Sequence, residues 1–235
     1  MNEQLKLSEG DTKYWTLLQP VVDWVTSQIS DGDKVLEIGP GSSPFPLADT
    51  FIGWADQDLF PKENLILCDI QKDTLPFADN EFDFVYCRHV LEDIYNPFHL
   101  CSEMSRVAKA GYIETPSPMA EMCRGIEGGS PEWRGFCHHR YIVWNDQKTL
   151  HFLTKYPIVE FVGSDNFDRE ILNNLRTNPI YWNNYFFWNN EILFTHHQHE
   201  VDYNLLENYG DMIVDAVKNY HAATNAFVQE LAKIQ

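Results

Sequence analysis

Short apolar runs alternate with amphipathic helical stretches through the first half of the chain. Each run is rich in β-branched or aromatic residues and is bounded by glycine, proline or polar turns, which is the pattern of buried strands. Helical spacing follows the fourth run over 90–94, and a helix capped by Asn96 is expected from Pro97 to about Val107. Strands that alternate with helices predict an α/β fold, with a mostly parallel sheet covered by helices on both faces. The predicted strands are 35–38, 50–54, 65–68, 82–87 and 112–116.

An amphipathic helical pattern precedes the first strand, over residues 8–30. Apolar residues recur there every three or four positions, and Pro20 is expected to divide the pattern into two short helices because proline disrupts a helix interior. We therefore treat residues 1–30 as an N-terminal helical segment and residues 31–116 as a ligand-binding core.

The pattern loosens after residue 116. An irregular excursion over 117–139 is expected to lead into hairpins and the remaining strands of a segment that ends at residue 200. The last segment, 201–235, has apolar residues at helical spacing and predicts a long amphipathic helix with Gly210 as its weak point. The expected elements between these two segments are a hairpin of 141–144 with 150–153, a strand over 156–162, and a second hairpin of 185–188 with 192–194.

Composition and charge narrow the class of protein. The 235 residues suffice for one domain with elaborations, and 17 Lys+Arg against 35 Asp+Glu give a formal net charge of −18. Such a surface disfavours nucleic acids and anionic membranes as partners. The chain shows no signal-peptide pattern and no apolar run of about 20 residues, and its five cysteines include no CxxC pair. These features predict a cytoplasmic protein.

The junction after the first strand carries the most chemical information. Gly39 and Gly41 let the backbone turn sharply and approach a ligand, although an ordinary tight turn would use the same residues. A dinucleotide-binding loop would need a third glycine where Pro44 stands, so a nicotinamide cofactor is disfavoured. Glu37 is a hydrogen-bond acceptor next to the turn, which favours a cationic or hydroxyl-rich ligand over a polyphosphate.

Four collinear motifs resemble those of the class I S-adenosylmethionine-dependent methyltransferases, in particular their type 11-like domain. They cover about residues 33–116 and depart from the family pattern at Ser43, where a third glycine is common, and at Asp93, where a histidine is usual. The resemblance implies a Rossmann-like methyltransferase fold, extended here by a hairpin insertion and the C-terminal helix. The motifs are VLEIGPG at 35–41, DIQKDTLPFADNEFD at 69–83, RHVLEDIYNP at 88–97 and SRVAKAG at 105–111.

The resemblance also implies S-adenosyl-L-methionine as cofactor and a role for each matching residue. Asp56, with Asp58 as the alternative, matches the acid that binds the ribose hydroxyls, although both could be solvated loop residues. Asp69 matches the acceptor for the adenine amino group, and Ile70 is expected to pack on the adenine ring. The residues expected around the methionine end and the methyl group are Glu37, Gly39, Pro40, Gly41, Cys87 and Arg88.

Three histidines are the candidates for catalysis. His89 follows the fourth strand, where it would border the methyl group or cap a following helix. His138 and His139 lie in the excursion that these enzymes use to cover substrate, where one could act as a general base or both could make structural hydrogen bonds. No metal site is expected, because His197 and His199 lack an obvious third ligand.

These features predict an enzyme that moves a methyl group in line from S-adenosylmethionine to a small-molecule or carbohydrate-like acceptor. The alternative is a non-catalytic binding or assembly protein that keeps the methyltransferase fold, which the intact Glu37, Gly39, Gly41 and Asp69 disfavour. The C-terminal helix is expected either to cover the sheet or to pair with its copy in a homodimer.

Overall fold

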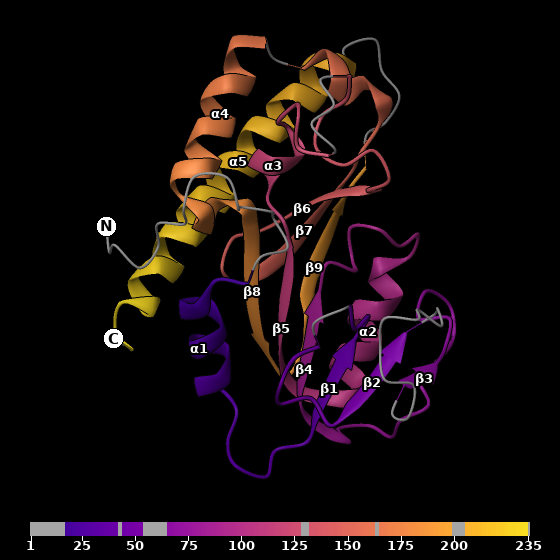
Figure 1. Cartoon of the computed structure of the whole chain (residues 1–235). Helices are drawn as coiled ribbons and strands as arrows, with labels where there is room; N and C mark the ends of the chain where they lie inside the picture. The colour runs from indigo at the N-terminus through magenta and orange to yellow at the C-terminus, as the bar shows by residue number, and fades with distance from the viewer. Residues whose placement is uncertain are drawn as a thin grey trace.

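A six-stranded sheet forms the centre of the computed structural model, which describes residues 17–41, 44–53, 65–127, 132–162, 165–198 and 205–234. Five strands are parallel and β8 is antiparallel to its neighbour β5. Figure 1 shows α2 on one side of this sheet and α1 with α5 on the other. The predicted α/β class is therefore confirmed. The strand order is β3 (Leu65–Leu67), β2 (Thr50–Gly53), β1 (Val35–Ile38), β4 (Phe82–Arg88), β5 (Ala108–Pro116) and β8 (Asn183–Asn189).

Alternating side chains of the central strand β4 enter two different cores. Val85 and Cys87 belong to the cluster that includes the buried face of α2 (Pro97–Val107). Phe84 and Tyr86 belong to the cluster of α1 (Gln19–Ser27) and the end of α5 (Leu205–Leu231). Period-two alternation with apolar residues on both faces is what a strand buried between two helical layers requires.

Helix α2 begins as the sequence predicts and then anchors the loop that precedes β4. The Asn96 side chain accepts a hydrogen bond from the His99 amide at 3.2 Å, and Pro97 occupies the first turn. The Arg106 guanidinium donates to the carbonyl oxygens of Leu75 and Phe77 at 3.0 and 2.8 Å. The loop of the LPF motif is thus fixed by a charged side chain on the neighbouring helix.

A second sheet of three strands holds the predicted hairpin. Its order is β6 (Tyr141–Asn145), β7 (Thr149–Thr154) and β9 (Leu193–His197), and β6 and β7 pair antiparallel as expected. The second predicted hairpin is wrong, because β8 pairs with β5 whereas β9 pairs in parallel with β7.

The chain changes sheets at the Asn189-Asn190 turn. Asn190 has a φ of 66°, and its amide donates to the Lys109 carbonyl at 2.7 Å. The Ile192 amide then donates to the Ser105 hydroxyl of α2 at 2.9 Å. These two bonds lead the chain along α2 to the second sheet, so it does not fold back on β8.

Two further local predictions are wrong. Residues 156–162 hold the 3₁₀ helix η3 (Pro157–Phe161) where a strand was expected, since proline fixes its own φ near the helical value and lacks an amide for a ladder. The helical spacing over 90–94 corresponds to turns and not to a helix.

Helices account for the other differences from the sequence. Pro20 lies in the first turn of α1 and so begins a helix that it was expected to divide; residues 8–16 of that pattern lie outside the described residues. The short α3 (Pro118–Glu121), α4 (Asp165–Thr177) and η4 (Pro179–Trp182) lie in segments for which no helix was predicted.

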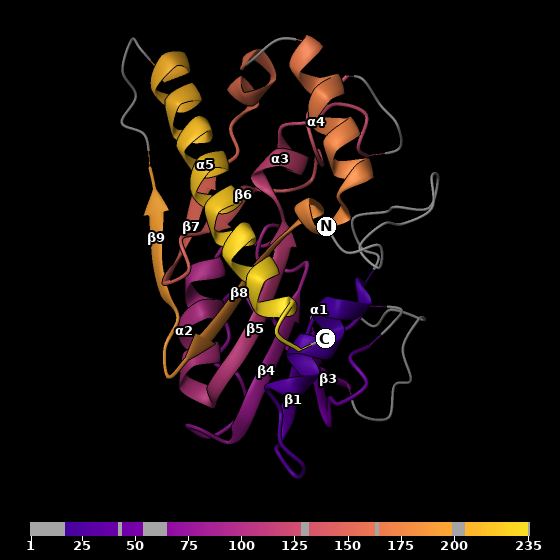
Figure 2. The same cartoon turned by 90° about the vertical axis from the view of Figure 1, so that its left-hand side faces the viewer.

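The predicted C-terminal helix is α5. Its side chains Ile213 and Tyr220 are buried in a third core with residues of α3, α4 and β6. Figure 2 shows α5 running across β8, toward α1 at its carboxyl end. Within the described ranges, no helix has the length and apolarity that crossing a bilayer requires.

Gly111 and Gly210 differ in how much space surrounds them, so alanine is expected to have opposite effects on stability at the two positions. A Cβ at Gly111 would stand 2.6 Å from the Val85 carbonyl oxygen and 2.8 Å from the Trp188 ring, whereas one at Gly210 meets only Val162 Cγ1, at 3.9 Å. We expect Gly111→Ala to lower the free energy of unfolding by about 1–3 kcal/mol through overpacking. Gly210→Ala should raise it by about 0.5–1 kcal/mol, because alanine favours the helix. Urea unfolding of both variants measures these changes in the free energy of unfolding. If the two substitutions changed it equally, the close packing around Gly111 would be contradicted.

Candidate functional site

The turn after β1 packs tightly against Val90 at Gly39 and has free space beside Gly41. Gly39 has a φ of +68°, its amide donates to the Ile52 carbonyl at 2.8 Å, and a Cβ there would stand 2.5 Å from Val90 Cγ2. No described atom lies within 4 Å of the place of a Cβ on Gly41. Parallel strands bind ligands at their carboxyl ends, so the open side of this turn faces the place where a ligand is expected. Pro40 lies between the two glycines in the same turn.

Glu37 is a buried acid beside this turn, 4% exposed. Its Oε2 accepts a hydrogen bond from the Phe45 amide at 2.8 Å. Burial raises the pKa of Glu37 to about 7, against the lowering effects of the Phe45 amide and of the Arg88 charge. A cationic ligand group placed here would favour the ionised carboxylate.

Arg88 lies at the end of β4 and is held by a buried carboxylate of β5. Its Nε donates to Glu114 Oε1 at 2.8 Å, and Glu114 also accepts from the Tyr112 hydroxyl at 2.6 Å and from Asn183 Nδ2 at 2.8 Å. Burial raises the pKa of Glu114, but Arg88 and His89 outweigh it and bring the pKa to about 2. Arg88 Nη2 is buried and has no hydrogen-bond partner among the described residues, so this guanidinium keeps a donor for an anionic group.

Asp69 follows β3 in a shallow depression at the same edge. Its side chain is 34% exposed, pairs with Lys72 Nζ at 2.8 Å and accepts from the Gln71 amide at 3.2 Å. The Lys72 hydrogen bond is the largest cause of its lowered pKa, although burial opposes it. Asp69 is therefore an ionised acceptor at the surface. The depression is lined by Leu67, Cys68, Asp69, Gln71 and Asp73.

Other residues predicted to bind the cofactor are placed differently or are not described. The side chains of Ile70 and Cys87 are each 1% exposed and belong to the core under the sheet, so the edge is formed by their backbones. Asp56 and Asp58 lie outside the described residues.

His89 lies between two carboxylates at the start of the turn after β4. Its φ is 54°, and its ring nitrogens are 3.4 Å from Glu92 Oε1 and 3.5 Å from Glu114 Oε1. Burial lowers the pKa of His89, but the two carboxylates outweigh it and raise the pKa above the ordinary value. The suggested helix cap is wrong because turns follow His89. The two carboxylates favour the protonated imidazole, which disfavours His89 as a general base.

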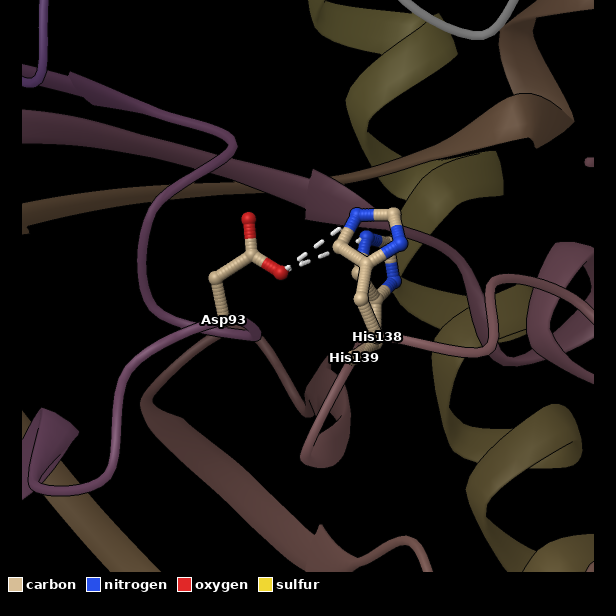
Figure 3. Close-up of side chains that lie close together, drawn as sticks. All are labelled: Asp93, His138 and His139. Carbon is tan, nitrogen blue, oxygen red and sulfur yellow. Dashed lines mark ion pairs between the residues drawn. The ribbon is translucent and has the colours of Figure 1, made fainter.

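His138 and His139 face Asp93 of the same turn, as Figure 3 shows. Asp93 Oδ1 is 3.6 Å from His138 Nε2 and 3.8 Å from His139 Nε2. The His138 side chain is 51% exposed whereas that of His139 is 1% exposed. The excursion therefore lies against the turn after β4. Asp93 was not predicted to take part in this long-range contact.

The buried partners of this cluster also escaped prediction. Glu121 accepts from His139 and from Lys155, and Glu127 pairs with His138. Acids in an irregular segment show no periodicity that could identify them as buried, so the sequence offers no signal for this part.

The comparisons with known proteins agree with the sequence motifs. Residues 47–113 match a family model described as a methyltransferase domain. No curated protein matches the chain. The resemblance to class I methyltransferases is thereby confirmed over the matched residues, and S-adenosylmethionine is the cofactor that this family implies.

Solved structures with a similar arrangement share low identity with this chain. A SAM-dependent methyltransferase from Thermotoga maritima is 20% identical with a TM-score of 0.33, over 40% of this chain and 48% of its own. One from Mesorhizobium loti is 13% identical with a TM-score of 0.34, over 57% and 64%. The N-terminal domain of EvdMO1, with SAH bound, is 18% identical with a TM-score of 0.33, over 44% and 52%. The match thus spans about half the length of the first of these chains.

The buried acid Glu37 gives a pH-dependent test of the site. Its pKa rises from the ordinary 4.5 to about 7 on folding, so the folded state loses stability as pH rises through this window. Glu37→Gln removes the ionisation, and its stability relative to the wild type should grow by about 3 kcal/mol between pH 4.5 and pH 8. Urea unfolding at several pH values measures this in the ligand-free protein. A difference that stays constant with pH would contradict a raised pKa.

Proposed function

Because residues 47–113 match a methyltransferase domain, we propose that the chain transfers a methyl group from S-adenosylmethionine to a small polar acceptor, a small molecule or a carbohydrate. The observation that carries the proposal is a buried acid at the end of β1 and a largely buried guanidinium at the end of β4. Glu37 is a buried acid whose pKa responds to a nearby cation, and Arg88 keeps a buried donor nitrogen without a partner among the described residues.

The residues of this edge fit the cofactor. The methionine end of S-adenosylmethionine carries an ammonium and a carboxylate group, which suit Glu37 and Arg88 respectively. Gly41 leaves room for a ligand to approach the backbone, and the ionised Asp69 offers an acceptor further along the edge. The cofactor, when bound, supplies an already activated methyl group.

The protein must then hold the acceptor in line with that group and exclude water. The excursion is tied to the turn after β4, because the Arg140 amide donates to the Glu92 carbonyl at 2.7 Å and Arg140 Nε donates to the Asp93 carbonyl at 3.0 Å. Asp93 and His138 therefore form a fixed wall beside the carboxyl end of β4. Positioning of this kind can be worth up to about 7–11 kcal/mol of the barrier.

The charge of this wall favours particular acceptors. Asp93 and Glu127 are acidic, His138 is half exposed between them, and the whole chain carries a formal −18. A neutral or cationic acceptor with hydroxyl or amino groups suits such surroundings better than a phosphorylated one. The proton that such an acceptor loses would pass to water at the exposed side of Asp93 and His138.

Calorimetric titration with S-adenosylmethionine and S-adenosylhomocysteine tests the cofactor site. We expect the wild-type protein to bind both, and Gly41→Val to lose at least tenfold in affinity because its side chain would enter the open space over the turn while the fold stays intact. Asp69→Ala should also weaken binding, because it removes the acceptor at the edge.

Asp215→Ala is the matched control, since this exposed aspartate of α5 pairs with a neighbouring lysine, as Asp69 does. It should bind like the wild type. Absence of binding to the wild-type protein would contradict the proposed cofactor. Retained binding in both Gly41→Val and Asp69→Ala would place the cofactor elsewhere on the chain.

A further inference from the structure

We propose that Asp93, His138 and His139 bind a divalent cation of the zinc type and leave at least one coordination position open. Their ligand atoms, one from each residue, all lie within 4.8 Å of one another. Two neutral imidazoles and one carboxylate form a donor set that zinc accepts in sites whose fourth position is free for water or substrate.

The distances suit one ion among the three residues. Ligands about 2.0–2.1 Å from a tetrahedral ion stand roughly 3.4 Å apart. Asp93 Oδ1 is 3.6 Å from one Nε2 atom and 3.8 Å from the other. These separations exceed good hydrogen bonds but need shifts of only a few tenths of an ångström to close around a cation.

The outer partners of the two imidazoles are the second observation. His139 Nδ1 is 2.5 Å from Glu121 Oε1, and His138 Nδ1 is 3.0 Å from Glu127 Oε1. A carboxylate at one ring nitrogen sets the tautomer and directs the other nitrogen toward the metal, which is the usual second shell of a metal-binding histidine. Here both rings have this support, and both present Nε2 toward the same carboxylate oxygen of Asp93 (Figure 3).

The supporting carboxylates are themselves fixed. Glu121 is 1% exposed, and its Oε2 accepts from Lys155 Nζ at 2.6 Å. Glu127 Oε2 accepts from the Cys137 amide at 2.8 Å and from Trp133 Nε1 at 3.0 Å. The orientation of the imidazoles is therefore built into the loop and does not depend on the surface rotamers.

Charge and access also favour a cation. The carboxylates of Glu92, Asp93, Glu121 and Glu127 gather around the two imidazoles, and the Lys155 ammonium is directed to Glu121 and to backbone carbonyls. Asp93 is 31% exposed and His138 is half exposed, so an ion can enter from solvent. An ion pair between Asp93 and a single histidine would not require the Nε2 atoms of both imidazoles to be directed at the same Asp93 oxygen.

Other histidines and a neighbouring cluster are weaker candidates. His151 Nδ1 and His197 Nε2 are 3.1 Å apart and already satisfy each other by a hydrogen bond. Glu127, Cys137 and His138 form a second close group, but there Glu127 supports His138 through Nδ1 and accepts two other hydrogen bonds. A cation in that group would displace these contacts.

The role of the cation rests on the proposed function. Asp93 belongs to the turn after β4, where the acceptor would lie, so the ion would stand beside the acceptor. There the cation would hold the acceptor oxygen and lower the pKa of its hydroxyl group. The hydroxyl proton passes to water, the oxygen bonds to the methyl carbon, and the carbon–sulfur bond breaks with its electron pair left on sulfur, which yields S-adenosylhomocysteine.

Titration of chelator-treated protein with Zn²⁺, followed by calorimetry, and with Co²⁺, followed by its visible absorption, tests the site. We expect one ion per chain, with affinity reduced at least tenfold in His138→Ala and in Asp93→Ala. His197→Ala and Cys137→Ser are the controls for the other groups and should bind as the wild type does. His138 and Asp93 are chosen because they are partly exposed, which spares the buried His139.

Several outcomes would overturn the inference. Wild-type protein that binds no ion, or variants of His138 and Asp93 that bind like the wild type, would do so, and loss of binding in Cys137→Ser would place the ion in the neighbouring cluster. Titration of the same samples with S-adenosylhomocysteine separates the two proposals. Retained nucleoside binding without metal binding contradicts the metal site alone, whereas metal binding without nucleoside binding contradicts the proposed function alone.

Discussion

The buried carboxylate of Glu114 is the interaction on which the carboxyl edge of the sheet depends. A charge inside a protein is tolerated only when partners satisfy it, and Glu114 draws Arg88 from β4, Tyr112 from its own strand and Asn183 from β8. Its backbone carbonyl also accepts the His89 amide at 2.8 Å. One residue therefore fixes the lateral order of three strands and the start of the turn that carries Asp93.

A second buried carboxylate organises the excursion in the same way. Glu121 accepts hydrogen bonds from Lys155 and His139. Burial raises its pKa, but these two partners outweigh burial and bring the pKa to about 2. Gly135 permits this approach, since a Cβ there would stand 2.6 Å from Glu121 Cα. The loop that reaches the β4 turn is thus held by charge and close packing, although it contains little regular structure, and this precision lets it contribute to a site.

Local chemistry allowed much of the core to be predicted from sequence. The strands of the first half are short apolar runs with clear turns, and the positive φ of Gly39 explains why a glycine follows β1. The departure of β9 from β8 could not be predicted, because it depends on bonds from Asn190 and Ile192 to residues far back in the sequence. Pattern analysis assumes that adjacent strands pair, and here a turn residue with positive φ sends the chain to another sheet.

The candidate site residues also differ in whether a local motif or a long-range contact identifies them. Glu37 and Asp69 could be identified because they stand at fixed offsets within motifs. The Arg88 nitrogen that lacks a partner among the described residues appears only when β5 is placed beside β4. The meeting of Asp93 with His138 and His139 joins segments about 45 residues apart, as the difference in their numbers shows. Sequence singled out the two histidines by their chemistry but offered no means to find the carboxylates that orient them.

The most direct test of the central claim is amide hydrogen exchange of the whole chain with and without S-adenosylhomocysteine. We expect the ligand to slow exchange in the turn after β1, in residues 69–71 and at the end of β4, and to leave exchange in β9 unchanged. Slowed exchange confined to the second sheet and α5, with the β1 turn unaffected, would contradict a cofactor site at the carboxyl edge of the first sheet.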